Sequence, residues 1–330
     1  MHIDLFLVLG SAVVGLLVGL TGVGGGALMT PMLVLVFGIT PTAAITSDLV
    51  AALFMKPAGV AIHWRKKTVN TGLVKYLCYG SLPAAFLGTY VMHLLGESAM
   101  AEHRLQMLLG AALIIGALAM LGRTLMAPTA NAKAIVVRKG ATITIGAVGG
   151  FMVGLTSVGA GSLIVVLLLF LYPSLRNSHL VGTDLAQSVP LTLSATLGTL
   201  LFNHVDFSLT SSIIIGSVPM VIVGSLLSSR SNGITLRRII TATVLLSGLK
   251  YIGVPINALG FAAVILAVGI IAMEVKQAGE RRRVKVETTS VTETVEDVVP
   301  LLPARLDLDA KLEVKPLGQL TSGGDAHVLE

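Results

Sequence analysis

The hydrophobic pattern of the chain consists of long apolar stretches separated by short polar loops. Two apolar segments, 4–37 and 142–172, are interrupted by glycine-rich centres and fit neither one straight span nor two spans with a loop. Backbone that leaves the helix inside a bilayer must be buried in protein or line a cavity, so these segments predict broken or re-entrant helical hairpins. Seven other stretches reach the roughly 17–25 residues that a bilayer crossing needs: 42–62, 72–95, 104–122, 180–202, 209–229, 236–252 and 254–273.

The two interrupted segments are copies of one another. Gly15–Leu28 reads GLLVGLTGVGGGAL, and Gly150–Leu163 reads GFMVGLTSVGAGSL. The similarity resumes downstream, where Ser47-Asp48-Leu49 matches Thr183-Asp184-Leu185 and Gly80–Gly88 matches Gly216–Gly224. Interrupted apolar segments at corresponding positions of two repeats point to a transporter binding site.

Lysine and arginine lie in alternate short loops, which predicts the cytoplasmic side. The order of crossings then places the N-terminus outside and the C-terminus in the cytoplasm, in the inner (plasma) membrane. Each repeat has an odd number of crossings, so we expect an all-α polytopic membrane protein built as an inverted repeat of one hairpin plus three transmembrane helices. The predicted divisions are a first transmembrane repeat (1–122), a cytoplasmic linker (123–139), a second repeat (140–252), one extra C-terminal transmembrane helix (253–274) and a cytoplasmic polar tail (275–330).

Composition agrees with this class of protein. Hydrophobic residues make up 54% of the chain and charged residues 12%, with a mean hydropathy of +0.88, so membrane lipid is an expected partner. The net charge of +6 comes with basic residues in loops, which indicates membrane orientation and no nucleic-acid binding. No hydrolytic, metal-binding or nucleotide-binding motif is present, so we expect no enzyme activity, no metal and no cofactor.

Glycine-rich interruptions can present backbone N–H groups at helix N-termini, where anions bind. We therefore expect a small anionic substrate between the two interruptions, with nearby hydroxyls as further donors. The alternative is that these glycines only allow helices to pack closely. The candidate substrate-binding residues are Thr21, Gly22, Gly24, Gly25, Gly26, Thr156, Ser157, Gly159, Gly161, Ser162, Gln187 and Lys56.

Asp48 and Asp184 lie near the starts of the helices that follow the hairpins. They are expected either to cap a hairpin or helix or to exchange a proton that couples to transport. Lys56 is too deep to reach the outer surface, so it either pairs with Asp48 or neutralises an anion. Asn70 and Asp206 occupy equivalent positions in the two repeats and are expected to cap helices.

The chain resembles the TauE/SafE family of membrane permeases, often called sulfite exporters, over about residues 5–273. The resemblance is carried by the Gly-x-Gly-Gly-Gly run at 22–26 with Leu28 and Pro31, by its degenerate second copy, by Gly182-Thr-Asp-Leu185 and by Val205-Asp-Phe207. It implies transport of small sulfur-containing anions such as sulfite or organosulfonates. Ala160 and Ser162 depart from the cleaner pattern of the hairpin, and Asn70 stands where the second repeat has Asp206.

We therefore expect a secondary transporter that exports such an oxyanion by alternating access between the two hairpins. The alternatives are an anion channel or uniporter, and a membrane sensor that signals through the 275–330 tail. A homodimer is left open by the sequence.

Overall fold

The computed structural model describes residues 4–22, 24–65, 68–95, 98–125, 137–159, 161, 163–175, 177–227 and 233–273. The chain divides into two compact units, Met1–Ala272 and Met273–Glu330. Ser162, most of the expected linker and the expected tail at 275–330 lie outside the described residues.

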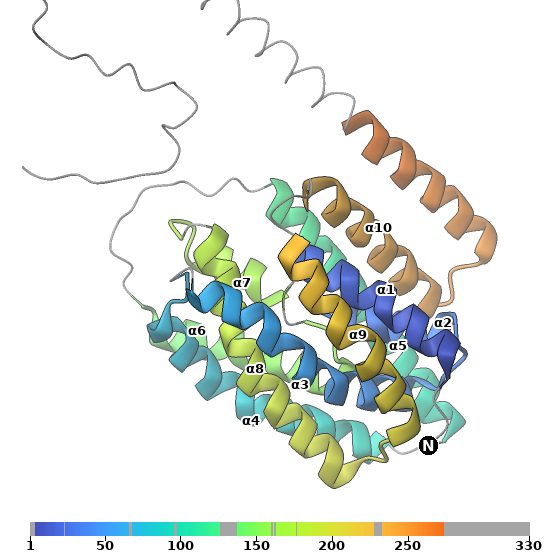
Figure 1. Ribbon diagram of the computed structural model, residues 1–330, viewed down its shortest axis with the longest axis horizontal. Coiled ribbons are helices and arrows are strands. Elements are labelled where there is room, and N and C mark those ends of the chain that lie inside the picture. Colours follow the sequence, from blue (N-terminus) through green and yellow to red (C-terminus); the bar gives the residue numbers. More distant parts are fainter. Residues whose placement is uncertain are drawn as a thin grey trace, which may run out of the picture. The chain divides into compact units, whose positions relative to one another are not determined.

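Throughout the described ranges the regular secondary structure is helical, as the all-α prediction requires. Its one β-type contact is an isolated bridge between Gly159 and Gly161. The helices are α1 (Leu5–Thr21), α2 (Gly26–Leu35), α3 (Pro41–Arg65), α4 (Thr71–Leu95), α5 (Ala99–Leu125), α6 (Lys139–Thr156), α7 (Leu163–Leu171), α8 (Asn177–Phe202), α9 (Phe207–Leu227), α10 (Gly233–Tyr251) and a final helix at Ile256–Met273 (Figure 1).

Side chains outside the apolar stretches fix where several helices begin. The Asp4 carboxylate accepts the N–H of Phe6 at 2.9 Å at the start of α1. Asn70 accepts the N–H of Leu73 at 3.1 Å before α4, and Asp206 accepts the N–H of Ser208 at 2.8 Å before α9. The prediction that Asn70 and Asp206 cap equivalent helices is confirmed, since either side chain can satisfy an otherwise free helix N–H.

Four of the described helices are long and apolar enough to cross a membrane: 99–122, 179–202, 207–227 and 256–273. The helix at 256–273 carries large apolar side chains that are well exposed, Phe261 at 74%. Such exposure is expected of a surface that faces lipid and costly for one that faces water. Apolar helices of this kind agree with a multi-pass membrane protein.

Both interrupted segments form broken helices, as the glycine-rich centres predicted. Helix α1 ends at Thr21 because Gly22 adopts a left-handed conformation, with φ of 67°, before α2 begins at Gly26. Helix α6 ends at Thr156 in the same way, but the left-handed residue is Ser157, with φ of 60°. A left-handed conformation is strained for a serine and free for a glycine, so Ser157 requires a compensating contact.

The first arm of each hairpin packs against a helix of the other repeat. Helix α1 lies along α9, and α6 lies along α4 (Figure 1). A Cβ atom at Gly15 would overlap the Ser217 carbonyl, and one at Gly150 would overlap the Ser81 carbonyl. These are equivalent contacts in the two repeats, so small residues bring both helix pairs together. Glycines within the arms therefore allow close packing, whereas Gly22, Gly159 and Gly161 at the breaks adopt positive φ.

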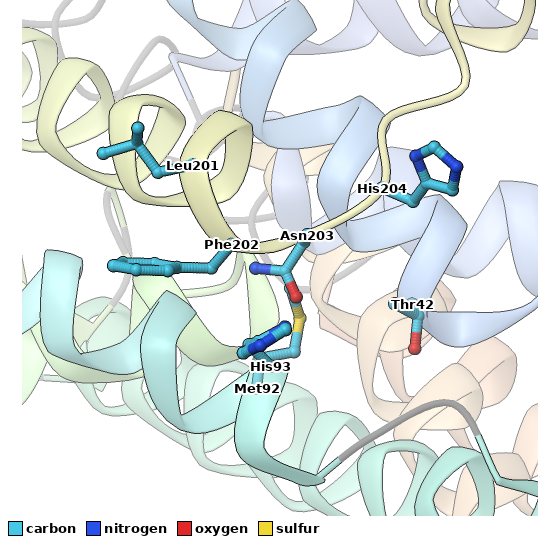
Figure 2. A pocket seen from close by; sticks show the side chains of 7 residues that line it. All are labelled: Thr42, Met92, His93, Leu201, Phe202, Asn203 and His204. Atoms are coloured by element: carbon cyan, nitrogen blue, oxygen red, sulfur yellow. The ribbon is translucent and has the colours of Figure 1, made fainter.

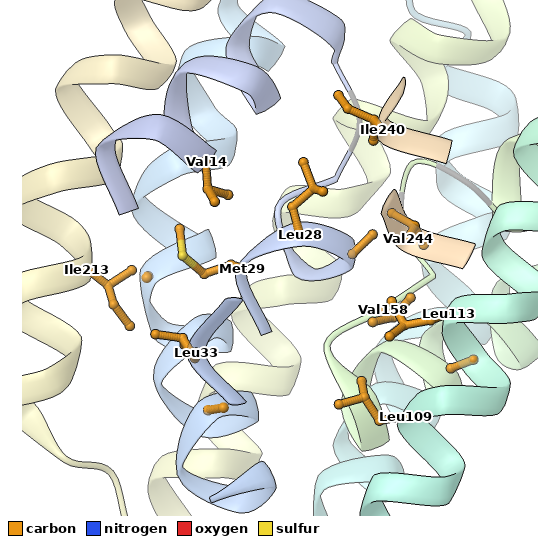
Figure 3. Close-up of a cluster of buried hydrophobic side chains, with 14 of the residues drawn as sticks. Val14, Leu28, Met29, Leu33, Leu109, Leu113, Val158, Ile213, Ile240 and Val244 are labelled. Carbon is orange, nitrogen blue, oxygen red and sulfur yellow. The ribbon is translucent and has the colours of Figure 1, made fainter. Parts of the chain in front are cut away.

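The short second arms lie inside two separate hydrophobic clusters. Figure 3 shows Leu28, Met29 and Leu33 of α2 among side chains from α1, α5, α9 and α10, and Met29 and Leu33 are fully buried. Ile164 and Leu168 of α7 are equally buried in a second cluster. A helix that is apolar on all sides is stable only when it is enclosed, so both clusters hold the arms that follow the breaks.

Candidate functional site

The two hairpin breaks meet backbone to backbone. A Cβ atom at Gly26, the first residue of α2, would overlap the carbonyl oxygen and carbonyl carbon of Ser157 at the end of α6. Only glycine allows this approach. The structure thus brings together two interruptions that are far apart in sequence.

Asp48 of α3 links the two hairpins at this contact. Its side chain is fully buried, and Oδ2 accepts the Ser157 hydroxyl at 2.7 Å and the Thr30 hydroxyl at 2.9 Å. The other carboxylate oxygen, Oδ1, is buried without a hydrogen-bond partner in the described part of the chain. Asp48 therefore joins α2 to the residue that ends α6 through two hydrogen bonds.

This contact also explains the serine in the left-handed position. Gly22 is its counterpart in the first repeat, where no side chain is present. The hydrogen bond from Ser157 to Asp48 compensates for strain of about 1–2 kcal/mol that a left-handed serine carries.

Lys56 lies further along α3 and donates a hydrogen bond to Thr192 Oγ1 of α8. Thr192 donates its own proton to the Ser188 carbonyl at 2.7 Å, so it accepts from Lys56. The ammonium is close enough to Asp48 and Asp184 for its charge to interact with both. Lys56 and Thr192 occupy equivalent positions in the two repeats, and this hydrogen bond therefore joins α3 and α8 at matching points.

Asp184 and Gln187 lie together on α8 and are both buried. Gln187 Nε2 donates to Ser81 Oγ of α4 at 2.6 Å, while its Oε1 has no hydrogen-bond partner within the described ranges. The neighbouring Thr183 hydroxyl accepts the backbone N–H of Asn70 at 3.1 Å. These bonds anchor α8 to α4 beside the second repeat's carboxylate.

The predicted hydroxyl donors are bonded within the protein in this conformation. Thr21 Oγ1 donates to the Leu17 carbonyl at 2.6 Å, and Thr156 Oγ1 donates to the Met152 carbonyl at 2.7 Å. Ser157 donates to Asp48. Each hydroxyl has only one proton to donate, so in this conformation these three protons are already used within the protein.

The other predicted glycines line the two breaks. Gly22 faces open space, since a Cβ there would meet no atom within 4 Å, and Gly25 lies beside Met55. Gly159 and Gly161 have φ of 133° and 89°. Leu163 at the start of α7 donates its N–H to the Gly159 carbonyl at 3.1 Å.

Sequence reasoning missed four residues that complete this region: Thr30, Ser81, Thr192 and Arg237. The repeat alignment carried a signal for two of them, since Thr192 is the counterpart of Lys56 and Ser81 belongs to a duplicated motif. Nothing comparable marked Thr30 or Arg237.

A separate cavity of about 390 Å³ lies at the ends of α4 and α8 (Figure 2). None of the predicted site residues lines it. Its lining residues are Thr42, Met92, His93, Leu201, Phe202, Asn203 and His204.

Comparison with known proteins places the chain among membrane transporters. Residues 7–251 match the family described as "Sulfite exporter TauE/SafE". The chain is similar to "Probable membrane transporter protein YjnA" of Bacillus subtilis (strain 168), with 40% identity over 253 residues, covering 72% of this chain and 96% of that protein. Two proteins of Xylella fastidiosa, from strains 9a5c and Temecula1, are each named "Probable membrane transporter protein" and are 30% identical over 235 residues, covering 69% of this chain and 86% of each relative. No solved structure matches the chain significantly.

Proposed function

Since the chain belongs to the sulfite exporter TauE/SafE family of membrane transporters, we propose that it is a secondary transporter that exports a small sulfur-containing oxyanion. Sulfite and organosulfonates are the substrate classes. The anion binds where the two hairpin breaks meet, between the N-terminal ends of α2 and α7.

The contact between Gly26 and Ser157 is the observation that carries this proposal. It places two helix interruptions beside each other, and the first N–H groups of a helix lack partners within that helix. Several such groups can satisfy the oxygens of one anion without a rigid salt bridge that would slow its release. Lys56 provides a positive charge in the same region, where an unpaired anion would otherwise be costly.

Charge balance suggests how transport is coupled. Asp48 and Asp184 together carry two negative charges when ionised, and Lys56 carries one positive charge. Protonation of one carboxylate would lower the repulsion that an added anion meets from this group. We assign hairpin capping to Asp48, because both of its neighbouring hydroxyls donate to it, and coupling to Asp184.

Reciprocal packing of α1 on α9 and of α6 on α4 supports an inverted repeat, with the two breaks as re-entrant hairpins. Rocking of one repeat against the other would open the site to each side in turn. The loop charges support an outside N-terminus and a cytoplasmic C-terminus.

Sulfite flux in proteoliposomes tests this function, with Gly25→Leu and Gly161→Leu as the site variants. Leucine at either position would obstruct the backbone N–H groups. We therefore expect flux to fall at least about tenfold in each variant, because each would lose one or more charge-assisted hydrogen bonds to the anion. Gly122→Leu is the control, because a Cβ atom at Gly122 would meet no atom within 4 Å. Unchanged flux in both site variants would refute the hairpin site.

A further inference from the structure

Arg237 reaches the first hairpin break from α10. Its neighbours on the same face of that helix, Ile240 and Val244, pack into the hydrophobic cluster around α2, and Figure 3 shows Ile240 close to Leu28. Residues three apart on a helix share a face. Arg237 therefore continues this apolar face toward the end of α1.

The guanidinium contacts the protein at the residue where α1 stops. Its NH2 group donates to the Thr21 carbonyl at 3.4 Å, which is a long hydrogen bond. The next residue, Gly22, faces open space, since nothing lies within 4 Å of the position of a Cβ there. Arg237 thus stands beside a glycine of the first break that faces open space.

A purely structural role leaves part of this side chain unexplained. An arginine at a helix C-terminus favourably caps its carbonyls, and the bond to Thr21 does so. The Nε atom, however, is buried and has no hydrogen-bond partner within the described residues. Leaving a charged donor buried and unsatisfied is costly, so a bound acceptor would recover that cost.

We propose that Arg237 is a binding residue for the transported oxyanion, which it contacts at the first hairpin break beside Gly22. This inference rests on the proposed function and adds a guanidinium to the same anion site. The planar fork of arginine pairs with two oxygens of one group, a geometry that sulfite and sulfonates offer and chloride does not. Arg237 accordingly favours oxyanions over halides.

Calorimetric titration of the purified full chain tests this role, with sodium sulfite, sodium methanesulfonate and sodium chloride at constant ionic strength. Arg237→Gln removes the charge, whereas Arg237→Lys keeps the charge and a donor for Thr21 but loses the fork. Arg238→Gln is the matched control, since it removes the same charge from the next residue. A monodisperse elution profile is the criterion that each variant is folded. If Arg237→Gln does not fold, Arg237→Lys is compared with the wild-type protein instead.

We expect the Kd for sulfite to rise at least about tenfold in both Arg237 variants and to change less than about twofold in Arg238→Gln. Wild-type protein is expected to bind both oxyanions more tightly than chloride. If the Arg237 variants bind sulfite as tightly as Arg238→Gln does, the role of Arg237 is overturned and the proposed function is not. Failure of the wild-type protein to bind either oxyanion would overturn the proposed function together with this inference.

Discussion

Ser157 donates its hydroxyl proton to Asp48 across the junction of the two repeats, at 2.7 Å. Asp48 follows the first hairpin in sequence, yet it stabilises the break of the second. The same carboxylate oxygen accepts from Thr30 in α2. One buried side chain therefore sets the relative position of both breaks, and any movement of one hairpin against the other must stretch or exchange these hydrogen bonds.

Replacing Asp48 with asparagine should loosen this junction. The substitution keeps the size of the side chain and removes its charge, so two charge-assisted hydrogen bonds become neutral ones. We expect the free energy of unfolding to fall by about 1–3 kcal/mol, measured by chemical denaturation in detergent. Asp206→Asn is the control, because Asp206 is an exposed helix cap and asparagine caps about as well as aspartate. Equal stability of the two variants would contradict the role given to Asp48.

Two substitutions at Ser157 should separate backbone strain from hydrogen bonding. Both Ser157→Ala and Ser157→Gly lose the bond to Asp48, but only glycine adopts φ of 60° without strain. The alanine variant should therefore be less stable than the glycine variant by about 1–2 kcal/mol. Thermal unfolding of the two proteins in one detergent measures the difference. An alanine variant as stable as the glycine variant would show that Ser157 is not strained.

Several of these features could be predicted from the sequence, because each depends on residues close together in the chain. The glycine-rich runs marked where α1 and α6 stop, and Asn70 and Asp206 marked where α4 and α9 begin. Local conformation decides both kinds of feature, since a helix ends where φ becomes positive and begins where a side chain accepts its free N–H groups.

Other features could not be predicted from the sequence, because they depend on tertiary packing between residues that are far apart in the chain. The duplicated motifs contained both Gly15 and Ser217, but nothing in their spacing indicated that α1 would pack along a helix of the other repeat. The sequence predicts Ser157 as a donor to the substrate, whereas the fold makes it a donor to Asp48. Arg237 belongs to the basic residues whose loop positions predict the cytoplasmic side, and only the path of α10 brings it to Thr21.

Alanine at Gly26 should disrupt the meeting of the two breaks. Its methyl group would overlap the Ser157 backbone, which cannot rotate away as a side chain could. We expect sulfite flux in proteoliposomes to be lost, because the two hairpins would be forced apart. Gly122→Ala should transport normally, since its methyl group enters open space. Normal flux in Gly26→Ala would show that transport does not need this contact.

Substitutions at Lys56 and Thr192 should change anion affinity in opposite directions. Lys56→Gln removes the positive charge and should raise the Kd for sulfite at least about tenfold, as expected for a lost charge-assisted hydrogen bond. Thr192→Val removes the acceptor that occupies the ammonium, so the anion no longer competes with it and the Kd should fall. Calorimetric titration measures both. A Kd that rises in Thr192→Val would indicate that Thr192 positions Lys56 for binding.

The number of sulfite ions bound per chain distinguishes one shared site from two independent ones. If both breaks hold the same anion, titration of the wild-type protein gives one ion per chain, and Gly25→Leu and Gly161→Leu each abolish binding. Two ions per wild-type chain, with one ion still bound in each variant, would contradict a shared site.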